Sequence, residues 1–178
     1  MRALVVFESM FGNTEKVAGA VARGLQHERV DTGLVEVRSA PARLAPDLDL
    51  LVVGGPTHAF SMSRAGTRAD AVRQGAPQER AGTGLREWLD AVELEAGHLP
   101  QLAAFDTRVT KVRWLPQAAA PSAARAGRHR GLHTLTKPIG FLVDDVRGPL
   151  LEPELERAGA WGRQLADALA DRAAAAEV

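Results

Sequence analysis

The sequence predicts an α/β fold in which a doubly wound parallel sheet of five strands carries helices on both faces. Apolar runs that suit strands alternate about five times with segments of helical periodicity along the chain. The first run, residues 3–7, is apolar throughout, which is typical of a strand buried on both faces of a parallel sheet. Because crossovers between parallel strands are right-handed, this alternation leaves few possible topologies.

The first strand leads through a short loop into a helix. The apolar residues of this helix recur at every fourth position: Val17, Val21 and Leu25. Asn13 and Thr14 precede them, and either side chain can cap the helix by accepting a hydrogen bond from an N–H of its first turn.

Two further strands follow that helix. Residues 33–38 alternate, with Val35 and Val37 on one face, as a half-exposed edge strand does. The third strand lies in the apolar run 48–54, and the turn residues Gly54-Gly55-Pro56 end it.

The second half of the chain supplies the remaining elements. The pattern predicts a short helix near residues 64–74, an amphipathic helix after Thr83 and strands at 101–105 and 139–143. A C-terminal helix starts at Pro153, a residue that the first helical turn tolerates. Residues 107–133 are expected to be irregular or partly helical, with Pro116 and Pro121 as breakers. Trp88 and Trp161 stand at helical spacing with other apolar residues and are expected in the core.

The composition is that of a globular protein. Hydrophobic residues make up 46% and charged residues 25% of the chain, and no apolar run is long enough to span a bilayer. The absence of cysteine excludes disulfides, zinc–thiolate sites and thiol catalysis. We expect residues 1–178 to form one domain in the cytoplasm without a membrane partner, since there is neither an interdomain linker nor a signal-peptide pattern.

The charges balance overall but are unevenly distributed. No acidic residue lies between Asp106 and Asp144. The same stretch contains a series of basic residues: Arg108, Lys111, Arg113, Arg125, Arg128, Arg130 and Lys137. Such segregation fits an anionic partner, either an acidic protein or NADPH, although a solvated loop explains it as well. Nucleic acid fits poorly, because few ring side chains accompany these charges and no binding-module signature is present.

The loop Ser9-Met10-Phe11-Gly12-Asn13-Thr14 joins the first strand to the first helix. Doubly wound folds bind phosphate at such loops, because the helix N-terminus offers unpaired N–H groups and a partial positive charge. Ser9 and Thr14 can donate hydroxyl hydrogen bonds, and Gly12 permits a tight turn. The loop contains no Lys or Arg, so dipoles and N–H groups would hold the phosphate. The alternative is an ordinary capped turn.

Three rival motifs are absent. The chain lacks both the G-x-G-x-x-G dinucleotide pattern and the P-loop that ends in Gly-Lys-Ser/Thr. Phe7 occupies the first glycine position of a G-x-S-x-G pattern around Ser9, which excludes a nucleophile elbow.

The segment Phe7-Glu8-Ser9-Met10-Phe11-Gly12-Asn13-Thr14-Glu15 resembles the FMN-phosphate loop of flavodoxins and flavodoxin-domain proteins. Pro56-Thr57-His58-Ala59-Phe60, after the third strand, resembles their next flavin loop, and Phe105-Asp106-Thr107-Arg108, after the fourth strand, resembles the third. The resemblance covers the whole chain. It implies the strand order 2-1-3-4-5, FMN at the switch point between strands one and three, and contacts to FMN from these three segments.

Two features depart from flavodoxins proper. Many of them sandwich the flavin between Trp and Tyr, but this chain has no Tyr, so stacking would fall to Phe60, Trp114, Phe11 or His58. Flavodoxins are also acidic near the flavin, whereas the segments expected at this rim are basic. Both departures concern the redox partner more than the fold.

The resemblance implies electron transfer by FMN, without a catalytic acid–base pair. Two alternatives stay open: an NAD(P)H-dependent quinone or nitro-compound reductase, and a regulatory or binding module that has kept the fold without the flavin.

His129 and His133 lie one helical turn apart and could suit a metal, but no carboxylate is near them in sequence, which favours a solvated face.

Overall fold

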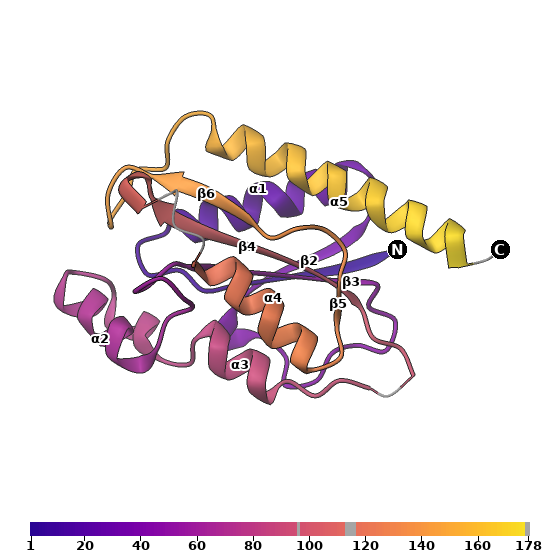
Figure 1. The fold of residues 1–178 in the computed structure, drawn as a ribbon, viewed down its shortest axis with the longest axis horizontal. Coiled ribbons are helices and arrows are strands. Elements are labelled where there is room, and N and C mark those ends of the chain that lie inside the picture. Colours follow the sequence, from indigo (N-terminus) through magenta and orange to yellow (C-terminus); the bar gives the residue numbers. More distant parts are fainter. Residues whose placement is uncertain (96, 113–116, 177–178) are drawn as a thin grey trace.

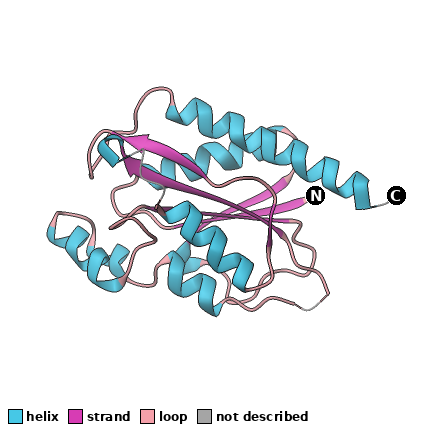
Figure 2. Ribbon diagram, in the orientation of Figure 1, coloured by secondary structure: helices cyan, strands magenta, loops and turns pink. Residues whose placement is uncertain are grey.

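The computed structural model describes residues 1–95, 97–112 and 117–176. In these ranges one sheet is built from β1 (Arg2–Phe7), β2 (Asp31–Glu36), β3 (Leu50–Pro56), β4 (Gln101–Val109), β5 (His133–Thr134) and β6 (Ile139–Val143). The helices are α1 (Asn13–His27), α2 (Ala65–Arg73), α3 (Leu85–Ala91), α4 (Ala119–His129) and α5 (Glu154–Ala176) (Figures 1 and 2).

The sheet is parallel throughout, and its order β2-β1-β3-β4-β5 confirms the predicted order 2-1-3-4-5. The fifth position is divided between two strands. β5 pairs with the start of β4, and β6 pairs with residues 105–109 of β4. Residues 135–138 separate the two pieces, where Pro138 has no N–H to donate to a ladder.

β4 is longer than predicted, since it continues to Val109 instead of ending at Phe105. The apolar pattern stops at Phe105, but the backbone ladder does not, because β6 pairs with the polar residues that follow. Segment 105–108 is therefore part of a strand and not, as expected, a loop after it.

α4 gives regular structure to much of the region expected to be irregular or partly helical. Pro121 lies in the first turn of α4, where a missing N–H costs little, so it does not break the helix. Pro116 lies outside the described residues.

Helices cover both faces of the sheet, α1 and α5 on one and α3 and α4 on the other (Figure 1). Alternate strand residues enter the two cores: Val5 and Val52 pack with α1 and α5, while Val6 and Val53 pack with α3 and α4. This confirms that the first strand is buried on both sides. No helix in the described ranges combines the length and hydropathy that membrane crossing requires.

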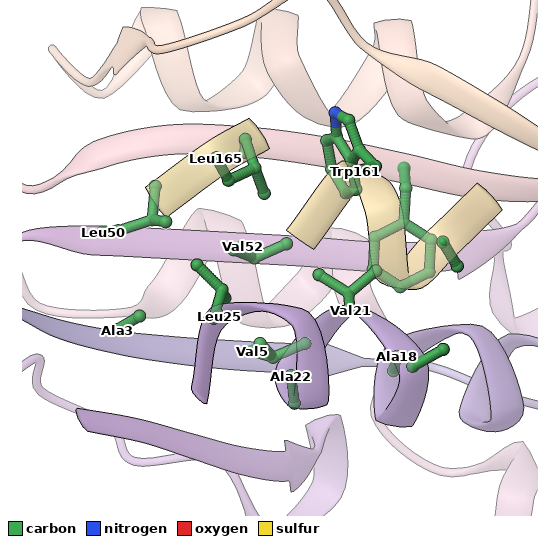
Figure 3. Packing of buried hydrophobic residues seen from close by; sticks show 14 of the residues in the cluster. Ala3, Val5, Ala18, Val21, Ala22, Leu25, Leu50, Val52, Trp161 and Leu165 are labelled. Atoms are coloured by element: carbon green, nitrogen blue, oxygen red, sulfur yellow. The ribbon is translucent and has the colours of Figure 1, made fainter. Parts of the chain in front are cut away.

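The core between the sheet and the helices α1 and α5 contains aliphatic side chains and Trp161 (Figure 3), together with Phe105 and Phe141. The rings of Phe105, Phe141 and Trp161 meet edge to face, with centroids 6.0 to 6.3 Å apart. α1 and α5 approach closely because Gly24 and Gly162 face each other: a Cβ on either glycine would lie less than 3.0 Å from backbone of the opposite helix. Trp88 is buried in the opposite core, so both tryptophans lie where the sequence predicted.

Candidate functional site

The loop between β1 and α1 turns at Gly12, whose φ of 87° lies in the left-handed region that glycine adopts without strain. The Gly12 N–H donates to Ser9 Oγ at 3.1 Å, which closes the turn. Gly12 is the residue that precedes the helix, and no side chain caps α1. The expectation that Asn13 or Thr14 caps the helix was wrong, because both are helical and their side chains bond elsewhere.

The first turn of α1 offers donors to a ligand. Lys16 N–H donates to Gly12 O, but in the described part of the chain the N–H groups of Asn13, Thr14 and Glu15 have no acceptor. A Cβ added to Gly12 would meet nothing within 4 Å, so the space beside the turn is open. Unpaired N–H groups at a helix N-terminus attract an anion.

A pocket opens at the carboxyl edge of β1, β3 and β4 next to this turn. It is lined by Ser9, Met10, Phe11, Asn13, Thr14, Pro56, Thr57, His58, Thr107, Arg108, Val109, Val143 and Val146. The hydroxyls of Thr14 and Thr107 lie 2.8 Å apart and join α1 to β4. Three predicted segments thus meet in one place.

The loop 144–149 also borders the pocket, which the sequence analysis missed. Asn13 Nδ2 donates to Arg147 O at 3.1 Å, and Gly148, with φ of 101°, packs against the Asn13 amide. Val146 lines the pocket and is 52% exposed. The position of this loop in the sequence could have indicated its place at the pocket. It follows the last strand, and the carboxyl ends of parallel strands lie at one edge of a sheet.

Arg80 lies beside the loop although the loop itself has no cation. Its guanidinium donates to Ser9 O at 3.1 Å and to the Glu15 carboxylate at 3.0 Å. Arg80 therefore pairs with the acidic group of the first helical turn. Arg80 is 71 residues from Ser9 in the sequence, so no local sequence pattern predicts this contact.

A buried polar cluster supports the loop from behind. Arg68, 3% exposed, binds Glu87 at 3.0 Å and donates to Ser63 Oγ at 2.9 Å. Glu8 Oε2 accepts from Leu85 N–H at 2.8 Å, but within the described residues Glu8 Oε1 has no partner. Burial raises the pKa of the Glu8 carboxyl, and its hydrogen bonds and the Arg68 charge oppose this rise.

The hairpin of residues 57–61 forms one wall of the pocket. His58 and Ser61 exchange two backbone hydrogen bonds of 2.9 and 3.0 Å, and Ala59 and Phe60 between them have φ of 45° and 64°. Thr57 and His58 line the pocket, whereas Ala59 and Phe60 line a neighbouring groove. Burial lowers the pKa of His58, and the nearby Arg68 charge lowers it further, which favours the neutral imidazole.

The segment 105–108 contributes less to the pocket than expected. Phe105 packs in the core and Asp106 is fully buried, so neither lines the pocket. Arg108 binds both Asp106 oxygens at 2.7 Å, and Ala120 N–H donates to the same carboxylate at 2.9 Å. Burial raises the pKa of Asp106, against the effect of Arg108. Thr107 and Arg108 remain at the pocket.

The ring side chains considered for stacking are separated. Phe11 and His58 line the pocket, Phe60 lines the groove beyond the hairpin, and Trp114 lies outside the described residues. Two cations of the basic stretch serve internal contacts: Arg108 binds Asp106, and Arg130 donates to carbonyl oxygens at the end of α3.

The fold resembles solved structures. A flavodoxin from the domain Archaea superposes with a TM-score of 0.64 at 18% identity, over 96% of this chain and 99% of the other. A flavodoxin from Streptococcus pneumoniae TIGR4 gives 0.62 at 20% identity, over 97% and 99%. The flavodiiron protein from Giardia intestinalis gives 0.61 at 19% identity, over 96% of this chain and 36% of its own. No family model and no curated protein matches the sequence.

These superpositions cover nearly the whole of this chain and of both flavodoxins. The strand order β2-β1-β3-β4-β5 is also the order typical of the flavodoxin-like fold. At identities of 20% or less, they establish architecture. This chain therefore has a flavodoxin-like fold.

Proposed function

We propose that this chain binds FMN with the cofactor phosphate at the N-terminus of α1, and that it transfers electrons. One observation carries the proposal: the N–H groups of Asn13, Thr14 and Glu15 lack acceptors among the described residues, beside open space at Gly12. An anion there would complete the hydrogen bonding of the first turn. The residues present therefore fit a phosphate group.

The position of the pocket supports the same ligand. In doubly wound sheets, ligands bind outside the carboxyl ends of the strands at the point where the strand order reverses, and flavodoxin binds FMN between its first and third strands. Here the pocket lies at the carboxyl ends of β1 and β3, which are neighbours. The similarity to structures named flavodoxins agrees with this assignment.

The proposed site divides into two parts. The backbone N–H groups of Asn13, Thr14 and Glu15 and the hydroxyls of Ser9 and Thr14 would hold the phosphate. Gly12 would leave room for it, and Met10 and Phe11 would shape its surroundings. The amide of Asn13 already donates to Arg147 O, so it would hold the loop 144–149 in place.

The isoalloxazine ring would lie toward the outer rim. The pocket encloses about 70 Å³, a fraction of the space that a whole cofactor fills. The segments Pro56–Phe60 and Phe105–Arg108 would border the ring, through Thr57, His58, Thr107 and Arg108. When bound, FMN supplies the redox chemistry, and a neutral His58 can donate or accept a hydrogen bond at its edge.

Titration with two flavins tests the phosphate contact. We expect FMN to bind with quenched fluorescence, and riboflavin, which lacks the phosphate, to bind at least about tenfold more weakly, since charge-assisted hydrogen bonds are lost. Saturating FMN should also raise the melting temperature. If FMN neither binds nor raises the melting temperature, the proposal is wrong.

A single substitution locates the phosphate. Thr14→Val removes the hydroxyl at nearly constant shape and should weaken FMN binding about tenfold while changing riboflavin binding little. Thr32→Val is the matched control, because Thr32 does not line the pocket and its hydroxyl donates to Val30 O, between the C-terminal end of α1 and the start of β2. Equal losses for FMN and riboflavin would place the phosphate elsewhere.

Steady-state oxidation of NADPH distinguishes an electron carrier from a reductase. A carrier passes electrons to and from protein partners, so we expect negligible steady-state oxidation of NADPH with a quinone as acceptor. Sustained NADPH oxidation by the FMN-loaded protein would instead identify an NAD(P)H-dependent quinone or nitro-compound reductase.

A further inference from the structure

A second concave surface lies between α3 and α4, which run side by side on one face of the sheet (Figure 1). We call it the α3–α4 groove. The hairpin residues Ala59 and Phe60 form one end of it, and His129 and Arg130 at the end of α4 form the other. Its volume is about 620 Å³, within the range of small-molecule sites.

The α3–α4 groove is strongly basic. Four arginines line it, Arg64, Arg86, Arg125 and Arg130, against one acidic residue, Asp90. In the part of the chain that the structure describes, none of these arginines forms a salt bridge with a carboxylate. A concave surface with unneutralised positive charge concentrates anions.

Two of the arginines are held in position. Arg86 donates to Ser61 Oγ and Met62 O, each at 3.0 Å, and Arg130 donates to Leu89 O and Val92 O. These acceptors are neutral, so they fix the guanidinium groups without cancelling their charge. Groups that are already ordered lose little entropy when they bind a ligand. Arg64 and Arg125 are exposed and can close on it.

An exposed aromatic ring completes the groove. Phe60 is 46% exposed at the hairpin end, where its ring offers a face for a planar base. The first N–H groups of α4 are already occupied, since Ala119 donates to Thr57 Oγ1 and Ala120 donates to Asp106. The guanidinium groups would therefore hold an anion, and Arg binds phosphate oxygens with matched geometry.

We propose that the α3–α4 groove binds a phosphorylated nucleotide, with its phosphate groups on Arg64 and Arg125 and its base against Phe60. The groove shape favours a small ligand over an extended protein surface, and the ring favours a nucleotide over a bare anion. This site goes beyond the proposed FMN function and does not depend on it, because the groove and the pocket share no lining residue.

Calorimetric titration with NADPH and with inorganic pyrophosphate tests the site, on the protein as purified and after saturation with FMN. We expect NADPH to bind more tightly than pyrophosphate, and salt to weaken both. The double variant Arg64→Ala, Arg125→Ala should bind NADPH at least about tenfold more weakly, since each guanidinium contributes charge-assisted hydrogen bonds. Phe60→Ala should weaken NADPH binding and leave pyrophosphate binding unchanged.

The control is Arg128→Ala. Arg128 is exposed on α4, as Arg125 is, but it does not line the groove. This variant should leave NADPH binding unchanged. FMN titrations separate the two proposals: the double variant Arg64→Ala, Arg125→Ala should keep the FMN affinity of the parent, and Thr14→Val should keep its NADPH affinity. Absence of NADPH binding, an equal loss in Arg128→Ala, or tighter binding of an oligoglutamate peptide than of NADPH would overturn the nucleotide site.

Discussion

Glu8 and Asp106 are buried carboxyl groups whose partners give them different roles. Both oxygens of Asp106 accept from Arg108, and Ala120 N–H adds a third hydrogen bond. Glu8 accepts from Leu85 N–H through one oxygen, and its other oxygen has no partner in the described residues. Asp106 therefore anchors the start of α4, whereas the charged form of Glu8 is incompletely satisfied.

The raised pKa of Glu8 makes its contribution to stability depend on pH. The folded state keeps the Glu8 proton to a higher pH than the unfolded state does. Its contribution is therefore fully present below the ordinary pKa of 4.5, and it is lost as pH rises through the folded pKa. Glu8→Gln cannot ionise, so its free energy of unfolding relative to the parent should increase between about pH 5 and about pH 8.

Urea unfolding at both pH values measures this difference. Other titrating groups, Asp106 among them, are common to both proteins and cancel in the comparison. A difference that stays constant with pH would show that Glu8 ionises in the folded protein as it does in the unfolded chain.

Among the elements, α1 and α5 pack most closely. Their crossing is possible because Gly24 lies against the backbone of Gly159 and Gly162, so neither helix can carry a side chain there. α1 holds the proposed phosphate donors at its first turn, and α5 supports it along its length. The position of the site thus depends on a contact between two backbones.

Gly24→Ala should lower the free energy of unfolding by about 3 kcal/mol, because the added methyl group meets backbone that cannot move aside. Gly19→Ala is the control in the same helix. Its Cβ would meet only the flexible end of Arg23, so the higher helix propensity of alanine should stabilise the protein by about 0.5–1 kcal/mol. Denaturant unfolding compares the two, and equal effects would contradict the close crossing.

At the scale of the whole molecule, one sheet separates two cores that share every central strand. Trp161, Phe105 and Phe141 fill the core under α1 and α5, and Trp88 fills the core under α3 and α4. Because alternate residues of β1 and β3 enter different cores, loss of packing on one side loosens strands that the other side needs.

Trp161→Ala should cost about 3–5 kcal/mol, as expected for a large ring removed from a packed core. The unfolding midpoint should fall equally when it is followed by circular dichroism and by the remaining tryptophan fluorescence, to which Trp88 in the opposite core contributes. Two separate midpoints would show that the cores unfold independently.

The architecture was predictable because its signals are local. The apolar run 3–7 and the helical spacing after Thr83 are each contained in a short window. So is the edge alternation of 33–38, although β2 spans Asp31–Glu36 and residues 37–39 form a 3₁₀ turn. The order of these signals predicts a doubly wound sheet. The strand order then followed from the resemblance carried by Ser9–Thr14, and the sheet has that order.

The parts that were missed depend on contacts between distant residues. Arg80 reaches Ser9 across 71 positions, and Glu8 meets Leu85 across 77. The extension of β4 depends on β6, whose pairing compensates for the polar sequence of residues 106–108. The periodicity of a helix or strand carries no information about contacts between residues that are distant in sequence. The residues around the loop Ser9–Thr14 could therefore be identified only from the folded structure.

The hairpin of residues 57–61 separates the pocket from the groove, and its two central residues both have positive φ. Its shape is fixed by the paired backbone bonds of His58 and Ser61 and by hydroxyl contacts of Thr57 and Ser61 with α4. The same short segment therefore borders both sites, so a ligand that displaced it on one side would alter the site on the other side. If the pocket binds FMN and the α3–α4 groove binds a nucleotide as proposed, thermodynamic reciprocity applies. Each ligand must then change the affinity of the protein for the other ligand by the same factor.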